Sequence, residues 1–406
     1  DHITAAATSE TTSVAIAVTG TGLAGAAAAS TSTANATAIA AGEGNDDLVN
    51  DGALEANATS TAEGVSVAFA SEGAALAGSF VDNATIAEAV SIGISGGDGH
   101  DRMTNNEGAD VTLTGRAEVT DTGVSVGLVG MAGADSQALA VVQASGIDGG
   151  DGNDTLVNSG SITGTDVTAA STARGISFAI AGAALSSANA TAEASAVGIS
   201  GGQGNDRITN NGLITLGPQA TTSGQTVGVS AIGAAINDAN ATSYATATGL
   251  DGGRDRDTII NNSTIDATAS STATAKSTGV VIGGYSLNQA NTTAHAEAIG
   301  IDGGDEDDAL LNADAGSIVI VADAQVYSKS LTISVLGDAS GEANTTAEST
   351  ATGLRGGTGD DAIANRRDVT VSATASGNSA GASIGLFGST QASAASTVDA
   401  VATGID

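Results

Sequence analysis

Apolar and polar residues alternate along most of this chain with a period of two. Between Ala188 and Ala196 every even position is alanine, and the odd positions carry Asn, Thr, Glu and Ser. Alanine favours helices intrinsically, but a helix would scatter these alanines around its whole circumference. In a strand, a period of two places them all on one face. The alternation therefore predicts β-strands with alanine on the buried face.

Two further phrases predict strands. Residues 155–162 place Leu156, Asn158, Gly160 and Ile162 on one face at the same period. The second phrase is GVSV-like and lies at residues 64–67, 123–126, 175–178 and 279–282. No segment predicts the helix that a βαβ crossover requires.

The strand phrases recur at a fixed interval. An aspartate is followed four residues later by an asparagine seven times, at Asp46/Asn50, Asp101/Asn105, Asp154/Asn158, Asp206/Asn210, Asp257/Asn261, Asp308/Asn312 and Asp361/Asn365. The glycine pairs begin at Gly96, Gly149, Gly201, Gly252, Gly303 and Gly356, at intervals of 53, 52, 51, 51 and 53 residues. Such a period indicates a repeat architecture. We therefore interpret residues 1–406 as a single array with turns near residues 42, 97, 150, 202, 253, 304 and 357.

We predict an all-β fold, a right-handed parallel β-solenoid with a repeat of about 52 residues and about eight coils. Each period forms either one broad coil with sides of roughly 12–16 residues or two smaller coils. An antiparallel meander is the rival fold, but it would not place identical turns on one edge. Both chain ends fall inside the repeat phrase, because Asp1–Thr4 resembles Asp206–Thr209 and Gly404–Asp406 resembles Gly146–Asp148. We therefore expect a segment of a longer array.

The repeated asparagines share a strand face with apolar residues. Asn158 follows Leu156 at period two, and the other copies have Leu, Met or Ile at the matching position. A buried amide must be hydrogen-bonded, and asparagines stacked about 4.8 Å apart can bond to one another along the axis. We predict an axial asparagine ladder that sets the register of the coils.

Composition narrows the classes of partner. The chain has 45 acidic and 11 basic residues, a net charge of −34, no Cys and 2% aromatic residues. This charge does not suit nucleic acid or an anionic membrane, and it favours divalent cations. The absence of Cys fits a secreted bacterial protein that is held together by metal rather than by disulfides. No apolar run is long enough to insert into a membrane.

No pattern in the chain is typical of an enzyme. The histidines, His2, His100 and His295, occupy unrelated positions in the repeat, and no GxSxG or HExxH phrase is present. The carboxylates recur as turn residues, whereas an active site is usually singular. We predict that the protein is not an enzyme.

The glycine-rich turns carry the candidate metal ligands. The phrase GGxGxD followed by a short apolar strand is clearest at residues 96–101, 149–154 and 201–206. It resembles the haemolysin-type calcium-binding repeat of secreted bacterial RTX proteins. The resemblance implies a parallel β-roll in which paired turns bind Ca²⁺ through the Asp carboxylate and backbone carbonyls. It covers about ten residues per unit, departs from the nine-residue period of that family, and weakens where Asp255 and Glu306 replace a glycine.

Charge repulsion favours the same ion. Stacked coils would bring Asp154 and Asp206 about 5 Å apart, where two carboxylates repel by roughly 1 kcal/mol in water and about 3–4 kcal/mol at an effective dielectric of 20. Ca²⁺ suits a site of oxygen ligands, and glycine lets backbone carbonyls turn towards it. The alternative is a plain glycine turn with solvated aspartates. The candidate Ca²⁺ ligands are Asp46, Asp98, Asp101, Asp151, Asp154, Asp206, Asp257, Asp308 and Asp361.

The strand face opposite the alanines is rich in Thr and Asn. Its N-A-T and N-T-T phrases match the glycosylation pattern, so one interpretation is glycans on Asn189, Asn240, Asn291 and Asn344. The other is a solvated or interfacial ladder that packs against another solenoid.

These patterns predict a structural protein: a segment of an extracellular bacterial filament, matrix or adhesin stalk, stiffened by Ca²⁺ at the turns and by asparagine ladders. We expect it to be secreted or at the cell surface. We also expect end-to-end self-association, since exposed strand edges template further strands. The alternative is a solenoid binding module whose Thr/Asn-rich face recognises carbohydrate or ice.

Overall fold

The computed structural model describes residues 2–78 and 84–406. Its strands are β1 (His2–Ala26), β2 (Thr31–Glu43), β3 (Asp47–Asn50), β4 (Ala53–Gly78), β5 (Thr85–Asp98), β6 (Arg102–Asn105), β7 (Asp110–Asp151), β8 (Thr155–Asn158), β9 (Ser161–Gln203), β10 (Arg207–Asn210), β11 (Leu213–Arg254), β12 (Thr258–Asn261), β13 (Thr264–Asp305), β14 (Ala309–Asn312), β15 (Ser317–Leu336), β16 (Ala339–Thr358), β17 (Ala362–Asn365), β18 (Val369–Phe387) and β19 (Thr390–Ile405). Among the described residues, no helix could span a membrane.

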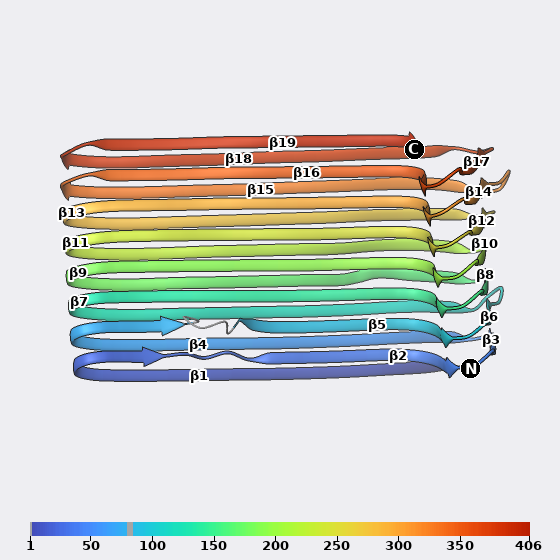
Figure 1. The fold of residues 1–406 in the computed structure, drawn as a ribbon, viewed down its shortest axis with the longest axis horizontal. Helices are drawn as coiled ribbons and strands as arrows, with labels where there is room; N and C mark the ends of the chain where they lie inside the picture. The colour runs from blue at the N-terminus through green and yellow to red at the C-terminus, as the bar shows by residue number, and fades with distance from the viewer. Residues whose placement is uncertain (1, 79–83) are drawn as a thin grey trace.

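Each repeat forms one broad, flat coil (Figure 1). An outgoing limb runs to one edge, folds back at a bend that we call the hook, and returns as a second limb to the glycine-rich turn, after which a short strand closes the coil. Coils 1 to 8 begin with β1, β4, β7, β9, β11, β13, β15 and β18. In coil 7 the limbs β15 and β16 have 20 residues each and β17 has 4. The prediction of sides of 12–16 residues was therefore wrong, because two long limbs take up most of the period.

A column of glycines makes the hook. Gly130, Gly182, Gly233 and Gly284 all have positive φ, which is +139° at Gly182. A Cβ on Gly182 would lie 1.6 Å from the carbonyl oxygen of Gly130 in the preceding coil. Glycine therefore allows successive hooks to stack without a clash.

All strand pairs are parallel and join like positions of neighbouring coils. The limbs form a 12-stranded sheet, and the short strands form a second sheet in the order β17-β14-β12-β10-β8-β6-β3. Asn189, for example, pairs with Asn240, which pairs with Asn291. The prediction of a parallel β-solenoid with a repeat of about 52 residues and about eight coils is confirmed, and the antiparallel meander is excluded.

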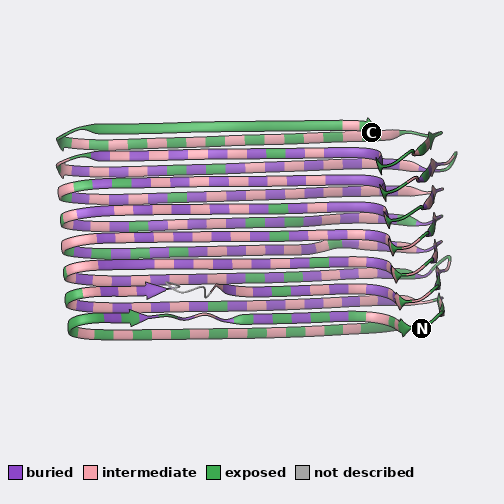
Figure 2. Ribbon diagram, in the orientation of Figure 1, coloured by how far each residue is buried: buried purple, intermediate pink, exposed green. Residues whose placement is uncertain are grey.

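The two limbs of each coil enclose a thin core of alanine. Figure 2 shows the alternation of buried and more exposed residues along the limbs. The alanines between Ala188 and Ala196 are at most 2% exposed. Larger side chains gather near the glycine-rich turn, where Ile147, Leu156 and Ile199 are fully buried. The core is therefore thickest where the short strand closes the coil.

Near the hook, the alternation places serine inside and aliphatic or aromatic residues outside. Ser177 and Ser186 are buried, and their Oγ atoms lie 2.7 Å apart across the two limbs. Ile176 and Phe178 point outward, and each is 40% exposed. The outer surface at the hook is consequently apolar.

The first coil corrects one alignment made from the sequence. Asp1 lies outside the described residues. His2, Ile3 and Thr4 pair with Ala53, Leu54 and Glu55 at the start of β4. The stretch thus belongs to the start of an outgoing limb rather than to the short strand that contains Arg207, because a match of four residues is too short to define a register. At the other end Ile405 pairs with Leu354 before the turn, as predicted.

Candidate functional site

The short strands carry an axial ladder of asparagines, which are buried except for the last one, Asn365. At each step the Nδ2 of one asparagine donates to the Oδ1 of the asparagine in the next coil, at 2.8–2.9 Å. The members are Asn50, Asn105, Asn158, Asn210, Asn261, Asn312 and Asn365. Asn261 also donates to the Ser263 carbonyl at 2.8 Å, so the amide holds the bend that follows the short strand. The predicted ladder is confirmed.

Seven aspartates form a second axial row, the aspartate row, just before the short strands. The Oδ1 of each accepts the backbone N–H of the aspartate in the preceding coil, at 2.7–2.9 Å. Asp154, for example, accepts the N–H of Asp101 and donates its own N–H to Asp206. The row consists of Asp46, Asp101, Asp154, Asp206, Asp257, Asp308 and Asp361. A backbone N–H donor therefore lies between successive carboxylates of the row. The sequence did not predict these backbone hydrogen bonds.

The second carboxylate oxygen of the aspartate row is buried without a partner. The Oδ2 atoms of Asp101, Asp154, Asp206, Asp257 and Asp308 have no hydrogen bond within the described residues. Their residues are 1–3% exposed. A Cβ on Gly201 would lie 2.6 Å from the Oδ2 of Asp206, so the first glycine of the pair makes room for the carboxyl group. Such an oxygen is costly to bury unless it takes up a proton or faces a cation.

Burial raises the pKa of four carboxyl groups in the middle of the row. The pKa reaches about 7 at Asp206, about 8 at Asp257 and about 6 at Asp308, with desolvation as the largest cause. Burial also raises the pKa of Asp154. The hydrogen bond from the preceding coil lowers each pKa, and neighbouring carboxylates raise it. These four groups therefore bind protons at higher pH than ordinary aspartates do.

The structure separates the predicted calcium ligands into two groups. Seven of them form the aspartate row, which is buried except at its half-buried ends Asp46 and Asp361, whereas Asp98 and Asp151 lie at the ends of β5 and β7, pair in register and are exposed. Gln203 Nε2 donates to Asp151 Oδ1 at 2.8 Å. Within the described residues, no group of three or more His, Cys, Asp or Glu side chains could hold a metal ion. Since Ca²⁺ takes six to eight oxygens, an ion at these turns has to draw most of its ligands from backbone carbonyls.

The residue before each aspartate forms a third, exposed row. Asn45 Oδ1 accepts the N–H of His100 at 2.9 Å, and His100 Nδ1 accepts the N–H of Asn153 at 2.7 Å. Asn153 Oδ1 in turn accepts the N–H of Asn205 at 2.7 Å. These bonds run along the axis in the opposite sense to those of the aspartate row. The sequence signal was the recurrence of Asn in GND, which we did not interpret.

Two turns keep their shape without the usual glycine. Asp255 and Glu306 have φ values of 72° and 74°, and they are the described residues other than glycine with positive φ. They lie at the positions where the resemblance to RTX repeats weakens. The positive φ at this position is therefore kept in these two copies, at a conformational cost, although the glycines of the other copies have larger values, such as 134° at Gly152.

The outward asparagines with the glycosylation pattern form their own ladder. Asn240 Nδ2 donates to Asn189 Oδ1 at 2.8 Å, Asn291 to Asn240 at 3.0 Å, and Asn344 to Asn291 at 3.1 Å. A glycan would be attached to this same Nδ2 atom. Glycosylation stays a prediction, and it would compete with the ladder.

A charged row lies beside the turns on the return limbs. It contains Asp148, Ser200, Asp251, Asp302 and Arg355, which pair in register. Arg355 bonds to Asp302 at 3.0 Å and to Glu297 at 3.1 Å. Burial raises the pKa of Asp251 to about 6, and Asp302 adds to the rise. Sequence analysis missed this row because its residue types differ from coil to coil.

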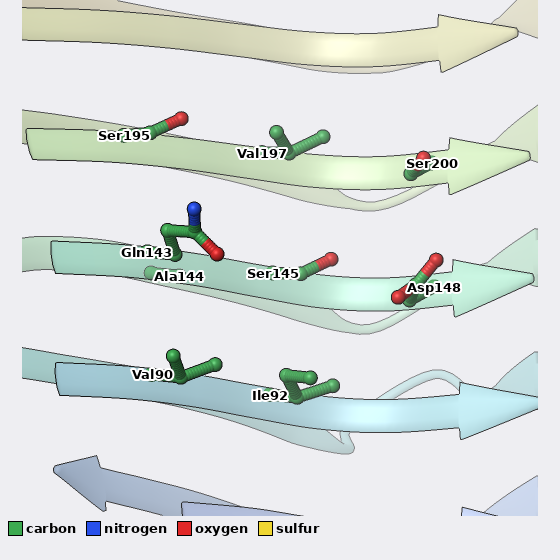
Figure 3. A pocket seen from close by; sticks show the side chains of 9 residues that line it. All are labelled: Val90, Ile92, Gln143, Ala144, Ser145, Asp148, Ser195, Val197 and Ser200. Atoms are coloured by element: carbon green, nitrogen blue, oxygen red, sulfur yellow. The ribbon is translucent and has the colours of Figure 1, made fainter. Parts of the chain in front are cut away.

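A shallow groove lies next to this row (Figure 3). It crosses three coils, with Val90 and Ile92 on β5, Asp148 on β7, and Ser195 and Val197 on β9. Asp148 is the one carboxylate among its lining residues, and the remaining side chains are aliphatic or small and polar. The lining of the groove therefore lacks the pair of titratable side chains that general acid–base chemistry would use.

No protein-family model, curated protein or solved structure matches this chain. The resemblance to RTX repeats consequently rests on the turn phrase alone, and function has to be argued from the geometry.

Proposed function

We propose that the protein is a structural rod, a segment of an extracellular bacterial filament, matrix or adhesin stalk. The observation that carries this proposal is the continuity of the axial rows. The asparagine ladder and the aspartate row both extend from coil 1 to coil 7 without a missing step. Neighbouring coils from coil 1 to coil 7 are therefore joined by side-chain bonds as well as by strand pairing.

The rows also resist slippage of one coil on the next. A shift by one residue would turn the alanine face outward and the polar face inward. The same shift would separate Asn158 from Asn210 and Asp154 from Asp206, whose buried polar groups would lose their partners. Both penalties support a rigid rod with one register.

End-to-end assembly is part of the proposal. The last limbs, β18 and β19, pair with coil 7 in the same parallel manner as the earlier coils pair with one another. A further coil would therefore add the same hydrogen bonds again, and an exposed edge of this kind templates the next strand. Continuation within a longer chain and head-to-tail stacking of separate chains would both produce a filament along the solenoid axis.

Electron microscopy of native material tests the rod. We expect fibres with an axial repeat of about 4.8 Å, which is the spacing of stacked strands. Discrete particles whose first and last coils are covered by other sequence would contradict the filament and leave only the fold.

Calcium at the glycine-rich turns is the second part of the proposal. It is supported by the stacked Oδ2 atoms without partners and by the net charge of −34. An ion that binds only the folded state raises the melting temperature, so excess EDTA should lower it. The Asp154→Asn variant should lose part of this response.

An unchanged melting curve in EDTA would refute the calcium site and leave protons as the charges that compensate the aspartate row. This result would not affect the proposal of a rod, which rests on the hydrogen-bonded rows.

A further inference from the structure

The outer surface near the hook carries an apolar row along the outgoing limbs. Its members pair in register from coil 1 to coil 8: Val18, Phe69, Val126, Phe178, Val229, Val280, Ile333 and Ile384. Val18 is 71% exposed, Phe178 40% and Ile384 53%. The adjacent row contains Ile16, Val67, Val124, Ile176 and Val227 in coils 1 to 5. We call this side of the solenoid the front face.

The next row on the front face is basic. Arg174 pairs with Gln225, Gln225 with Lys276, and Lys276 with Lys329. Lys276 and Lys329 are the two lysines of the whole sequence, which has 45 acidic residues. Arg174, Lys276 and Lys329 are exposed, and none forms an ion pair within the described residues. Three cations without carboxylate partners therefore line one edge of the apolar surface.

The outer surface of the return limbs, the back face, has the matching order of rows. An apolar row with Leu76, Leu185, Ile236 and Leu287 lies nearest the hook, and beyond it an acidic row contains Asp135, Ser187, Asp238, Gln289 and Glu342. A shallow groove crosses both rows and is lined by Asp135, Leu185, Ser187, Ile236 and Asp238. The Oδ1 of Asp238 has no hydrogen bond within the described residues.

We propose that the front face of one solenoid packs on the back face of a second copy of this chain, so that solenoids associate side by side. The inference deepens the proposed function and rests on it, since it names the partner of the rod. With both hooks on the same side and a lateral offset of about 10 Å, the row of Ile176 meets the row of Leu185 and the basic row meets the acidic row. Front-to-front packing would oppose Lys276 to other cations, and back-to-back packing would oppose Asp238 to other carboxylates.

The spacing of the charges fits this arrangement. Arg174 and Lys276 lie two coils apart, with Gln225 between them, and Asp135 and Asp238 also lie two coils apart, with Ser187 between them. An axial offset of one coil therefore places Arg174 at Asp135 and Lys276 at Asp238 together. A second copy has the same rise per coil, so the match holds along the contact.

The available area is sufficient for a specific interface. At an axial offset of one coil, three rows about 7 Å apart overlap over seven coils about 4.8 Å apart and cover roughly 700 Å², close to the area of about 800 Å² that each partner of a standard protein interface contributes. The apolar part is a parallel sheet face, and parallel sheets are usually covered on both faces.

Sedimentation of rods at increasing concentration tests the contact with two variants. R174E/K276E reverses two of the three cations of the front face, and D135K/D238K reverses two of the three carboxylates of the acidic row on the back face. Each variant alone should associate at least tenfold more weakly than the wild type. Mixed in equal amounts, they should associate again, because the altered front face of one variant and the altered back face of the other carry opposite charges, and the two unaltered faces also match. The wild type should form larger lateral assemblies that weaken with salt.

The control is R102E/R207E, which makes the same change of charge at exposed positions on the short strands and should associate like the wild type. Circular dichroism and melting curves establish that each variant folds.

Phe178→Asp should also abolish association without changing the coils. The proposal would be overturned by wild-type rods that stay single at every concentration, by a control that behaves like R174E/K276E, or by dimers of D135K/D238K alone. If the rods keep their axial repeat of about 4.8 Å but do not associate side by side, the lateral contact is refuted and the proposed function as a structural rod is unaffected.

Discussion

The two ends of each coil are held in register by different interactions. At the turn end, buried asparagines and aspartates bond from coil to coil, and large aliphatic residues fill the core. At the hook end, a column of glycines with positive φ stacks so closely that no Cβ fits. The interior there contains alanine and serine, and in later coils also buried asparagine and threonine, with Asn237 Nδ2 donating to Asn288 Oδ1 at 2.6 Å. Side-chain hydrogen bonds therefore run through coils 1 to 7 at the turn end, whereas at the hook end the glycine backbone specifies the register in every coil and side-chain bonds add to it locally.

The largest effect should come from the hook. Gly182→Ala introduces a Cβ 1.6 Å from the Gly130 carbonyl oxygen at a φ of +139°, and we expect a loss of about 4 kcal/mol in the free energy of unfolding. Gly108→Ala is the matched control, because Gly108 also has positive φ but no atom within 4 Å of the added Cβ. It should cost only about 1 kcal/mol. Equal losses in denaturant titrations would mean that close stacking of the hooks does not stabilise the rod.

The asparagine ladder should give the next largest effect. Asn210→Ala removes the acceptor of Asn158 Nδ2 and the donor to Asn261 Oδ1 in a fully buried site, and should cost about 1–3 kcal/mol. Asn240→Ala removes a member of the outer ladder, where water can replace the lost bonds, and should cost about 0.5 kcal/mol. A comparison of the two melting curves tests whether burial makes the inner ladder the stronger one.

The aspartate row should make stability depend on pH. Because the folded pKa values of Asp206, Asp257 and Asp308 are raised, the folded state binds more protons than the unfolded state, and stability falls as pH increases. In the presence of EDTA, the melting temperature should decline from about pH 4 through pH 8, the range set by Asp308, Asp206 and Asp257. Asp257→Asn should flatten the upper part of this decline. A melting temperature that rises over this range would show that the row is ionised in the folded state.

The smallest effect should come from the turns that lack a glycine. Glu306 has a φ of 74°, and Glu306→Gly removes the cost of a left-handed conformation. We expect a gain of about 0.5–1 kcal/mol in the free energy of unfolding. Glu306→Ala serves as the control, since it keeps a Cβ and should give no such gain.

Much of the fold could be predicted because the repeat makes each signal appear many times. The inward alanines, the single row of seven asparagines and the parallel stacking all followed from a period of two inside a period of about 52 residues. The N-terminal alignment failed because Asp1–Thr4 is a single short match that no other copy supports. The charged row of Asp251, Asp302 and Arg355 was missed for the opposite reason, since its residue types are not repeated.

The sequence by itself determined which residues face inward and that coils stack in parallel, because strand periodicity and the buried amide each allow one solution. The tertiary structure decided how the period is divided, since the length of a limb depends on where the hook glycines stack on the preceding coil. It also placed the backbone N–H of one coil against the Asp Oδ1 of the next. The residue pattern within one strand cannot indicate this contact, because the two groups belong to different coils. The front and back faces likewise exist only after folding, because Arg174 and Lys276, or Asp135 and Asp238, meet only when separate coils are brought into register.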